Sequence, residues 1–384
     1  MPLLMAHALL SPSAAHRWLS CTPSAVLESR EPDAETDFAL EGTLAHAVSA
    51  RKLKQWLGED HRGEDEEIAA LWPRFGSGEM DEYTDEYVSI VLAKLAEAQR
   101  VCSDARLLVE RRVEFGDYAP GSFGTADAVI IADGVMDVVD FKYGKGVRVD
   151  AERNPQMMLY GLGAYMAESF AYNIASVRMT IVQPRIGNVS SWEISAEALE
   201  DWAEYVLKPK AMMAARGEGD AAPGEWCRFC RVKGKCRALA SMCLEVASSA
   251  DARLLSPDEM AHDVLPRLAT IKSWIDSVES LALESALSGT RFDGYKIVEG
   301  RSVRRFSDPL AVREALLRAG YNADQIDKPL ELRGITELER LVGKKLLAEM
   351  CGEWLVKPKG KPTLVPVSDK RPPYNPAADD FTDF

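Results

Sequence analysis

The segment GTADAVIIADGVMDVVDFKYG, residues 124–144, decides the fold. It contains two runs of β-branched and apolar residues separated by Asp133-Gly134, a dipeptide typical of a two-residue hairpin turn. Counting outward from that turn places Asp127 directly opposite Asp140 on the neighbouring strand. Like charges in this position destabilise a sheet, so the pairing predicts a divalent cation bound between the two carboxylates.

Lys142 lies two residues beyond Asp140 and therefore on the same face of the strand. Val139 and Phe141 point the other way, into the expected core. A cation held by two carboxylates lowers the pKa of bound water and stabilises negative charge on a phosphoryl group. A neighbouring ammonium can orient the attacking water or hold the phosphate. The pattern favours phosphodiester hydrolysis, although a solvated hairpin in which Asp140 and Lys142 merely pair fits the same residues.

The sequence after the hairpin predicts a helix that begins near the end of the second strand. Asn154 is a favourable N-cap and Pro155 is favourable at the first helical position, so we expect a helix over residues 155–169. Gln156 and Tyr160 are four residues apart and therefore share one face of that helix. The helix start thus adds an amide and a phenol to the group of polar side chains.

Further elements surround this region, and together they predict an α/β protein with a central mixed sheet flanked by helices. Apolar periodicity indicates helices at 11–20, 43–57, 82–100, 195–215 and 264–287, and strands at 107–115 and 176–183. The acidic stretch Glu59–Glu67 indicates a solvated loop. We expect three parts: a large domain over 1–250, a smaller α+β domain over 251–370, and an acidic disordered tail over 371–384.

The overall charge limits the class of protein. The net charge of −14 and the sequence pI of about 5.0 argue against a globally basic coat protein for nucleic acid. They are compatible with an enzyme that has acidic metal ligands and a local basic track. No apolar run reaches the roughly 18–20 residues that cross a bilayer, and the N-terminus lacks the basic start of a signal peptide. We therefore expect a cytoplasmic protein without a membrane partner.

Three of the seven cysteines lie within ten residues, at Cys227, Cys230 and Cys236. Such spacing in a reducing compartment indicates a metal site, and thiolate ligands suit either zinc or an iron–sulfur cluster. The spacing does not choose between these two. The same loop carries cations that are either a contact for the DNA backbone or a solvated face: Arg228, Arg231 and Lys233.

Taken together, the motifs resemble the RecB/AddB-type branch of the PD-(D/E)XK nuclease superfamily, which includes the CRISPR-associated exonuclease that processes spacers. The sequence G-T-A-D matches the first acidic motif at Asp127, with Ala126 where the proline of the superfamily's name stands. The sequence D-F-K matches the second motif at Asp140 and Lys142. This resemblance implies a restriction-endonuclease-like core.

Two further motifs of that family are present. Q-x-x-x-Y is matched at Gln156 and Tyr160, and the upstream G-x-x-x-H is matched at Gly42 and His46. The resemblance implies Mg²⁺ or Mn²⁺ bound by His46 and the two aspartates, with the lysine activating water and the glutamine and tyrosine supporting the site.

The resemblance also favours iron–sulfur over zinc. SPSAAHRWLSC, residues 11–21, resembles the N-terminal helix of these nucleases, which nominates Cys21 as a fourth ligand beside the three clustered cysteines. In that family four such cysteines hold a [4Fe–4S] cluster, which clips together the two ends of the nuclease domain. Structural zinc in the same place remains the alternative.

The C-terminal part resembles an uncharacterised family of phage and prophage RecB-like proteins, through GYKIVEGRSVRRF (294–306) and GKPTLVPVSDKRP (360–372). Arg301, Arg304 and Arg305 alternate with aromatic residues there, as on surfaces that bind single strands, although an ordinary amphipathic hairpin fits equally. The ending AADDFTDF resembles acidic tails that dock partner proteins; a solubilising tail is the alternative.

The function that the sequence favours is a metal-dependent DNA exonuclease, acting on DNA ends or single strands in phage replication or recombination. Its expected partners are DNA and a phage single-stranded-DNA-binding protein, helicase or recombinase in the host cytoplasm. The alternative is a DNA-binding or recombination scaffold that keeps a nuclease fold without catalysis.

Overall fold

The structure is a computed structural model that describes residues 8–32, 36–145, 147–247, 256–300, 304–328, 331–356, 362–366 and 372–374. The chain divides into two compact units, Met1–Trp274 and Ile275–Phe384. We expected a boundary near residue 250, whereas this division falls within α11 (Leu268–Leu287). The expected tail over 371–384 lies outside the described residues, apart from 372–374.

A five-stranded mixed sheet forms the centre of the first unit, with the strands in the order β1-β2-β3-β4-β5. β3 and β4 are parallel and the other neighbours are antiparallel. The helix α6 (Pro155–Glu168) connects the parallel pair, as the crossover requires. The strands are β1 (Arg106–Glu114), β2 (Phe123–Ile131), β3 (Gly134–Phe141), β4 (Ile174–Gln183) and β5 (Asn188–Ser195).

The hairpin between β2 and β3 has the register that its turn predicts. Ala128 pairs with Val139, Val129 with Val138 and Ile130 with Asp137, which is the register expected from the turn, and the paired stretch ends one residue before Asp127 and Asp140. Gly134 has a φ of +90°, a left-handed conformation that glycine adopts without steric cost. The two-residue turn therefore fixes which side chains meet at the far end of the hairpin.

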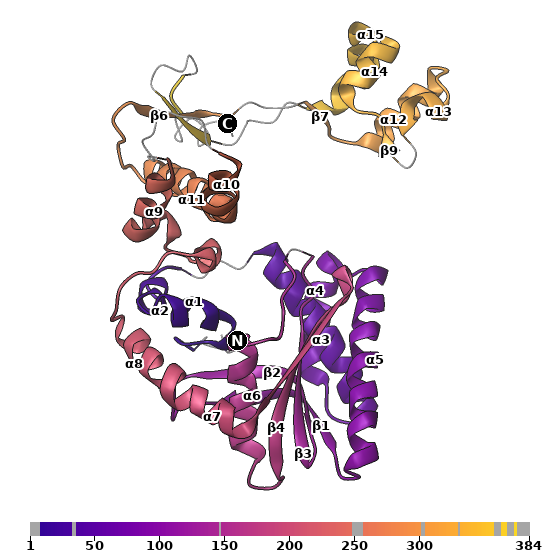
Figure 1. Cartoon of the computed structure of the whole chain (residues 1–384). Coiled ribbons are helices and arrows are strands. Elements are labelled where there is room, and N and C mark those ends of the chain that lie inside the picture. Colours follow the sequence, from indigo (N-terminus) through magenta and orange to yellow (C-terminus); the bar gives the residue numbers. More distant parts are fainter. Residues whose placement is uncertain are drawn as a thin grey trace. The chain divides into compact units, whose positions relative to one another are not determined.

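Helices cover both faces of this sheet (Figure 1). One face packs against α6, α7 (Ala196–Trp202) and α8 (Lys208–Arg216), and the other against α3 (Asp37–Leu57) and α5 (Gly78–Val101). The short helices α1 (Ala15–Ser20) and α2 (Ser24–Glu28) contact α8. Val139 and Phe141 are buried in the core beneath α3 and α5, as expected.

We predicted a solvated loop over the acidic stretch Glu59–Glu67, and that prediction was wrong. The stretch contains the start of the helix α4 (Arg62–Phe75). Its acids occupy the first helical turn, where they favour the helix dipole. They also form ion pairs with cations of α3, because Glu64 contacts Lys54 and Asp65 contacts Arg51, each at 2.6 Å. These pairs with α3 add to the stability of the helix.

Among its described residues, the second unit contains three small antiparallel pairs, most of α11, and four further helices that share a separate core. The pairs are β6 (Tyr295–Glu299) with β11 (Pro362–Pro366), β7 (Arg305–Phe306) with β10 (Leu355–Val356), and β8 (Asp327–Lys328) with β9 (Glu331–Leu332). The four further helices are α12 (Pro309–Arg318), α13 (Ala323–Ile326), α14 (Ile335–Val342) and α15 (Lys344–Cys351).

Shorter elements complete the description. α9 (Arg237–Ala247) and α10 (Pro257–Glu259) precede α11, and single turns occur at Pro12–Ala14, Pro184–Ile186, Ala203–Leu207, Glu225–Phe229, Lys233–Lys235, Met260–Val264, Leu265–Arg267 and Gly352–Trp354. Within the described ranges, none of the helices combines the length and the apolar character needed to span a bilayer.

Candidate active site

Three of the predicted catalytic side chains meet at the end of β3. Lys142 follows the strand directly, and its Nζ lies 2.9 Å from Oδ2 of Asp140. The same Nζ donates a hydrogen bond to Oε1 of Gln156 at 3.0 Å. The lysine is therefore held between a strand carboxylate and an amide from the first turn of α6.

Gln156 owes its position to the start of α6. The side chain of Asn154 caps the helix by accepting hydrogen bonds from the backbone N–H groups of Gln156 and Met157. Nε2 of Gln156 then donates to Oδ1 of Asp140 at 3.4 Å and to the hydroxyl of Tyr160 at 3.2 Å. The Q-x-x-x-Y pair thus contacts the D-F-K pair, as the helical spacing predicts.

His46 approaches from α3, on the other side of the hairpin end. Its Nδ1 lies 3.2 Å from Oδ1 of Asp127, and the backbone N–H of Phe141 donates to Oδ2 of the same aspartate at 2.7 Å. The imidazole also packs against the Phe141 ring, with centroids 5.5 Å apart. Asp127 is therefore oriented by both of its oxygens before any ion binds.

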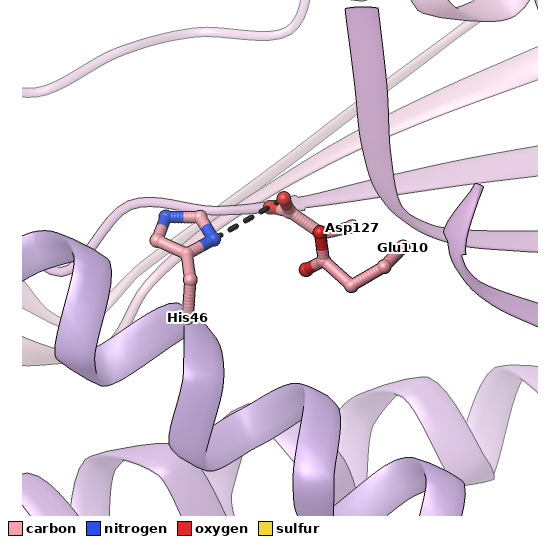
Figure 2. Close-up of side chains that lie close together, drawn as sticks. All are labelled: His46, Glu110 and Asp127. Carbon is pink, nitrogen blue, oxygen red and sulfur yellow. Dashed lines mark ion pairs between the residues drawn. The ribbon is translucent and has the colours of Figure 1, made fainter. Parts of the chain in front are cut away.

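Glu110 of β1 lies beside these residues, although no sequence motif pointed to it. One ligand atom each from His46, Glu110 and Asp127 lies within 4.8 Å of the others, a grouping that can hold a metal ion (Figure 2). Asp140, which we expected as a ligand, is not in that group. The connection between β1 and β2 is too long for the register of these strands to be inferred from a tight turn. The sequence therefore could not predict that Glu110 faces Asp127.

Burial and mutual repulsion shift the pKa values of these groups. Burial alone would lower the pKa of His46, but Asp127 and Asp140 raise it to about 9. Burial and the neighbouring Asp127 together raise the pKa of Glu110 to about 8. Burial also raises the pKa of Asp140, whereas Lys142 opposes that shift. The cluster holds more negative charge than its surroundings balance, which is the condition that a cation relieves.

The donor set fits a divalent cation. Oδ2 of Asp140 is buried without a hydrogen bond of good geometry, although the Lys142 ammonium is close enough to form an ion pair. Carboxylates and one imidazole suit Mn²⁺, whereas Mg²⁺ takes fewer protein ligands and keeps more water. The residues present therefore fit the cation that the motifs imply.

Two buried amides fix the loop that connects Lys142 to α6. Gln183 accepts a hydrogen bond from the backbone N–H of Val149 at 2.8 Å and donates one to the carbonyl of Val147 at 3.0 Å. Asn188 donates to the carbonyl of Val149 at 3.0 Å. The end of the β4–β5 hairpin thereby holds this loop in place.

The cysteines predicted to form a clip line a single cavity, at Cys21, Cys227, Cys230 and Cys236. The buried hydroxyl of Ser24 lies on the same cavity and has no hydrogen-bond partner. Glu28 joins the two chain segments around it, because its carboxylate forms an ion pair with Arg17 and accepts the backbone N–H of Arg231 at 2.7 Å. The structure thus brings residues near 21 and residues near 230 together.

Two of the cations expected to contact DNA, Lys233 and Arg304, have partners within the protein. Nζ of Lys233 donates to the carbonyl of Arg228 and to Ser273. In the second unit Arg304 forms an ion pair with Glu339, and Arg305 lies in β7. Arg301 lies outside the described residues, so its predicted role stays a prediction.

Comparison with known proteins identifies the family but not the activity. A crystal structure from Eubacterium rectale, of a protein provisionally assigned as an exonuclease, shares 10% identity, with 66% of this chain and 93% of that chain covered and a TM-score of 0.35. The crystal structure of SSO0001 shares 12% identity, with 58% and 96% covered and a TM-score of 0.24. Both likenesses are too weak to bear on function. Residues 7–372 match the family described as "Protein of unknown function (DUF2800)", and the chain therefore belongs to that family.

Proposed function

We propose that this protein is a metal-dependent nuclease that hydrolyses phosphodiester bonds in DNA, acting on ends or single strands as an exonuclease. The observation that carries the proposal is the contact of Lys142 with both Asp140 and Gln156 at the strand end where His46 orients Asp127. A solvated hairpin requires none of these contacts. Their convergence from two strands and two helices is typical of a preorganised hydrolytic site.

Each side chain then has a definable task. Mg²⁺ or Mn²⁺, held by His46, Asp127 and Asp140, would supply a water of lowered pKa and neutralise charge on the phosphate. Lys142 donates a hydrogen bond to the attacking water or to a phosphate oxygen. Gln156 fixes the lysine by accepting one of its protons, and it is itself held by the hydroxyl of Tyr160.

We also propose that the four cysteines around Ser24 hold a [4Fe–4S] cluster. All four cysteines line one cavity, so their sulfurs can serve a single metal centre. Thiolates suit zinc as well as iron–sulfur clusters, and the resemblance to nucleases with four such cysteines favours the cluster. The unpartnered Ser24 hydroxyl suits a group with sulfur acceptors. Anaerobic purification tests this: a colourless protein with zinc but no iron or sulfide would refute the cluster.

The nuclease proposal is tested with anaerobically purified full-length protein and end-labelled DNA, single-stranded, blunt, and with 3′ or 5′ tails, with Mn²⁺ or Mg²⁺. We expect cleavage by the native protein and none by Asp140→Asn or Lys142→Ala. Asp201→Asn and Lys210→Ala change the same residue types at exposed helical positions and should cleave normally.

Undiminished cleavage by both site variants would refute the assignment. Binding of DNA by the native protein without cleavage of any substrate would instead support the non-catalytic scaffold.

A further inference from the structure

β1 is irregular at one residue, Glu110. Its φ is +51°, in the left-handed region, and it is one of two non-glycine residues with positive φ in the part of the chain that the structure describes. The pairing with β2 is continuous on both sides of Glu110 and Asp127, but these two face each other without pairing. A glutamate rarely adopts this backbone conformation, and such departures cluster at functional sites.

The irregularity changes which face of the sheet each strand presents. Leu107 is buried beneath α3 and α5, whereas Val113 is buried on the α6 side. In a regular strand two odd-numbered residues share one face, so the strand changes face between them, at Glu110. β2 changes face at the same level, since Ala128 is buried beneath α3 and α5 and Ala126 on the α6 side.

This change of face delivers two carboxylates to α3. With regular alternation Glu110 would share a face with Leu108, which packs on the α6 side. Instead, its carboxylate lies with Asp127 beside the imidazole of His46, as Figure 2 shows. The strained backbone and the three-residue group are therefore one feature, because the first produces the second.

We propose that Glu110 is a protein ligand of the cation, and that His46, Glu110 and Asp127 form its primary binding set. The proposal rests on the metal dependence proposed above and changes the role of Asp140. That residue contacts Lys142 and Gln156, and in this arrangement its task is to hold the lysine. One imidazole and two carboxylates in a largely buried site favour Mn²⁺ over Mg²⁺.

The proposal separates metal affinity from stability. Without a cation, the Glu110 carboxyl lies beside Asp127, where it must either take up a proton or repel the second carboxylate, and its backbone is strained. Replacing Glu110 should therefore weaken metal binding and stabilise the metal-free protein. A residue that served only the fold would show the opposite effect on stability.

The variants are Glu110→Gln, which keeps the shape and removes the charge, and Glu110→Asn, whose side chain tolerates the left-handed region well. The control is Glu114→Gln, on the same strand but exposed. Mn²⁺ affinity is measured by calorimetry and by the electron paramagnetic resonance of free Mn²⁺, and thermal midpoints are recorded with and without Mn²⁺. We expect both variants at position 110 to lose affinity roughly 10-fold or more and to melt higher than the native protein when metal-free. The control should change neither quantity.

Mn²⁺ affinity within twofold of native in Glu110→Gln, or lower metal-free midpoints in both variants, would overturn the assignment. The readouts need no cleavage, so the two proposals fail separately. If Glu110→Gln still cleaves DNA and binds Mn²⁺ as tightly as the native protein, only the assignment of Glu110 as a metal ligand is refuted. If the native protein binds Mn²⁺ through Glu110 but cleaves no DNA, only the nuclease proposal is refuted.

Discussion

The carboxylate centre and the cysteine cavity are both candidate metal sites of the first unit, but they are built differently. Apart from His46, the carboxylate centre comes from adjacent strands and the helix after them, within residues 110–160. The cysteine cavity joins Cys21 to a loop that ends at Cys236. One site is therefore an outcome of the sheet, whereas the other connects distant parts of the chain.

The difference predicts which site keeps its shape without its metal. Hydrogen bonds orient Asp127 and Gln156 in the structure, so the carboxylate centre is preorganised. Around the cysteines, a few polar contacts connect the chain segments: Glu28 with the backbone of Arg231, Thr22 with the carbonyl of Glu218, and the Glu31–Lys235 ion pair. We therefore expect metal loss to change the chemistry at the first site and the stability at the second.

The largest effect should follow loss of a cysteine ligand. Cys230→Ser should remove the visible colour and lower stability by about 4–5 kcal/mol, as expected for losing a cross-link that closes a loop of more than 100 residues. Asp140→Asn should leave the thermal midpoint near or above that of the native protein. Cys243→Ser, a buried cysteine outside the proposed ligand set, is the control and should keep the colour. Equal midpoints for Cys230→Ser and the native protein would show that the clip is dispensable.

The next effect concerns the Arg17–Glu28 ion pair, whose carboxylate also accepts the backbone N–H of Arg231 from the other chain segment. Glu28→Gln leaves the Arg17 guanidinium without its partner in a site where both side chains are largely buried. Loss of one partner from a buried pair costs about 3 kcal/mol or more. The double variant Arg17→Met with Glu28→Gln should regain part of that loss, because no uncompensated charge remains. Additive effects of the two substitutions, measured by denaturant unfolding, would contradict a coupled pair.

The hairpin register could be predicted because a two-residue turn allows a single pairing, and that register brings Asp127 and Asp140 to the same end of the hairpin. The helix start at Asn154 was equally predictable, since capping chemistry is local. Glu110 was not predictable, because its position depends on a face change shared by two strands. The helix at Arg62 was missed for a related reason, since its acids are stabilised by cations from another helix. Cys21 came from the resemblance, not from any spacing to its proposed partners.

A smaller effect tests the rigidity of the carboxylate centre. Gln183→Leu removes the partners of two backbone groups, the N–H of Val149 and the carbonyl of Val147. An unsatisfied buried polar group costs about 1–3 kcal/mol. The variant should also lower kcat, because the loop from Lys142 to α6 loosens, and speed hydrogen exchange at Val149. Gln55→Leu, the same change at an exposed position, is the control. Native exchange at Val149 in Gln183→Leu would show that the amide does not hold the loop.

The smallest effect is a pH dependence that the two sites should not share. In the metal-free protein the pKa of His46 is raised to about 9 from an ordinary value near 6.5, so protonated His46 stabilises the fold fully below pH 6.5. That stabilisation is lost as pH rises towards 9, and Glu110, with a pKa raised to about 8, loses its proton in the same range. The thermal midpoint of protein free of divalent cations should therefore fall between pH 6.5 and 9. Mn²⁺ should reverse the fall, because the cation takes the place of the protons and binds more tightly as pH rises. His46→Gln should flatten the profile, and a midpoint that rises with pH in the metal-free native protein would contradict the charge balance argued for this centre.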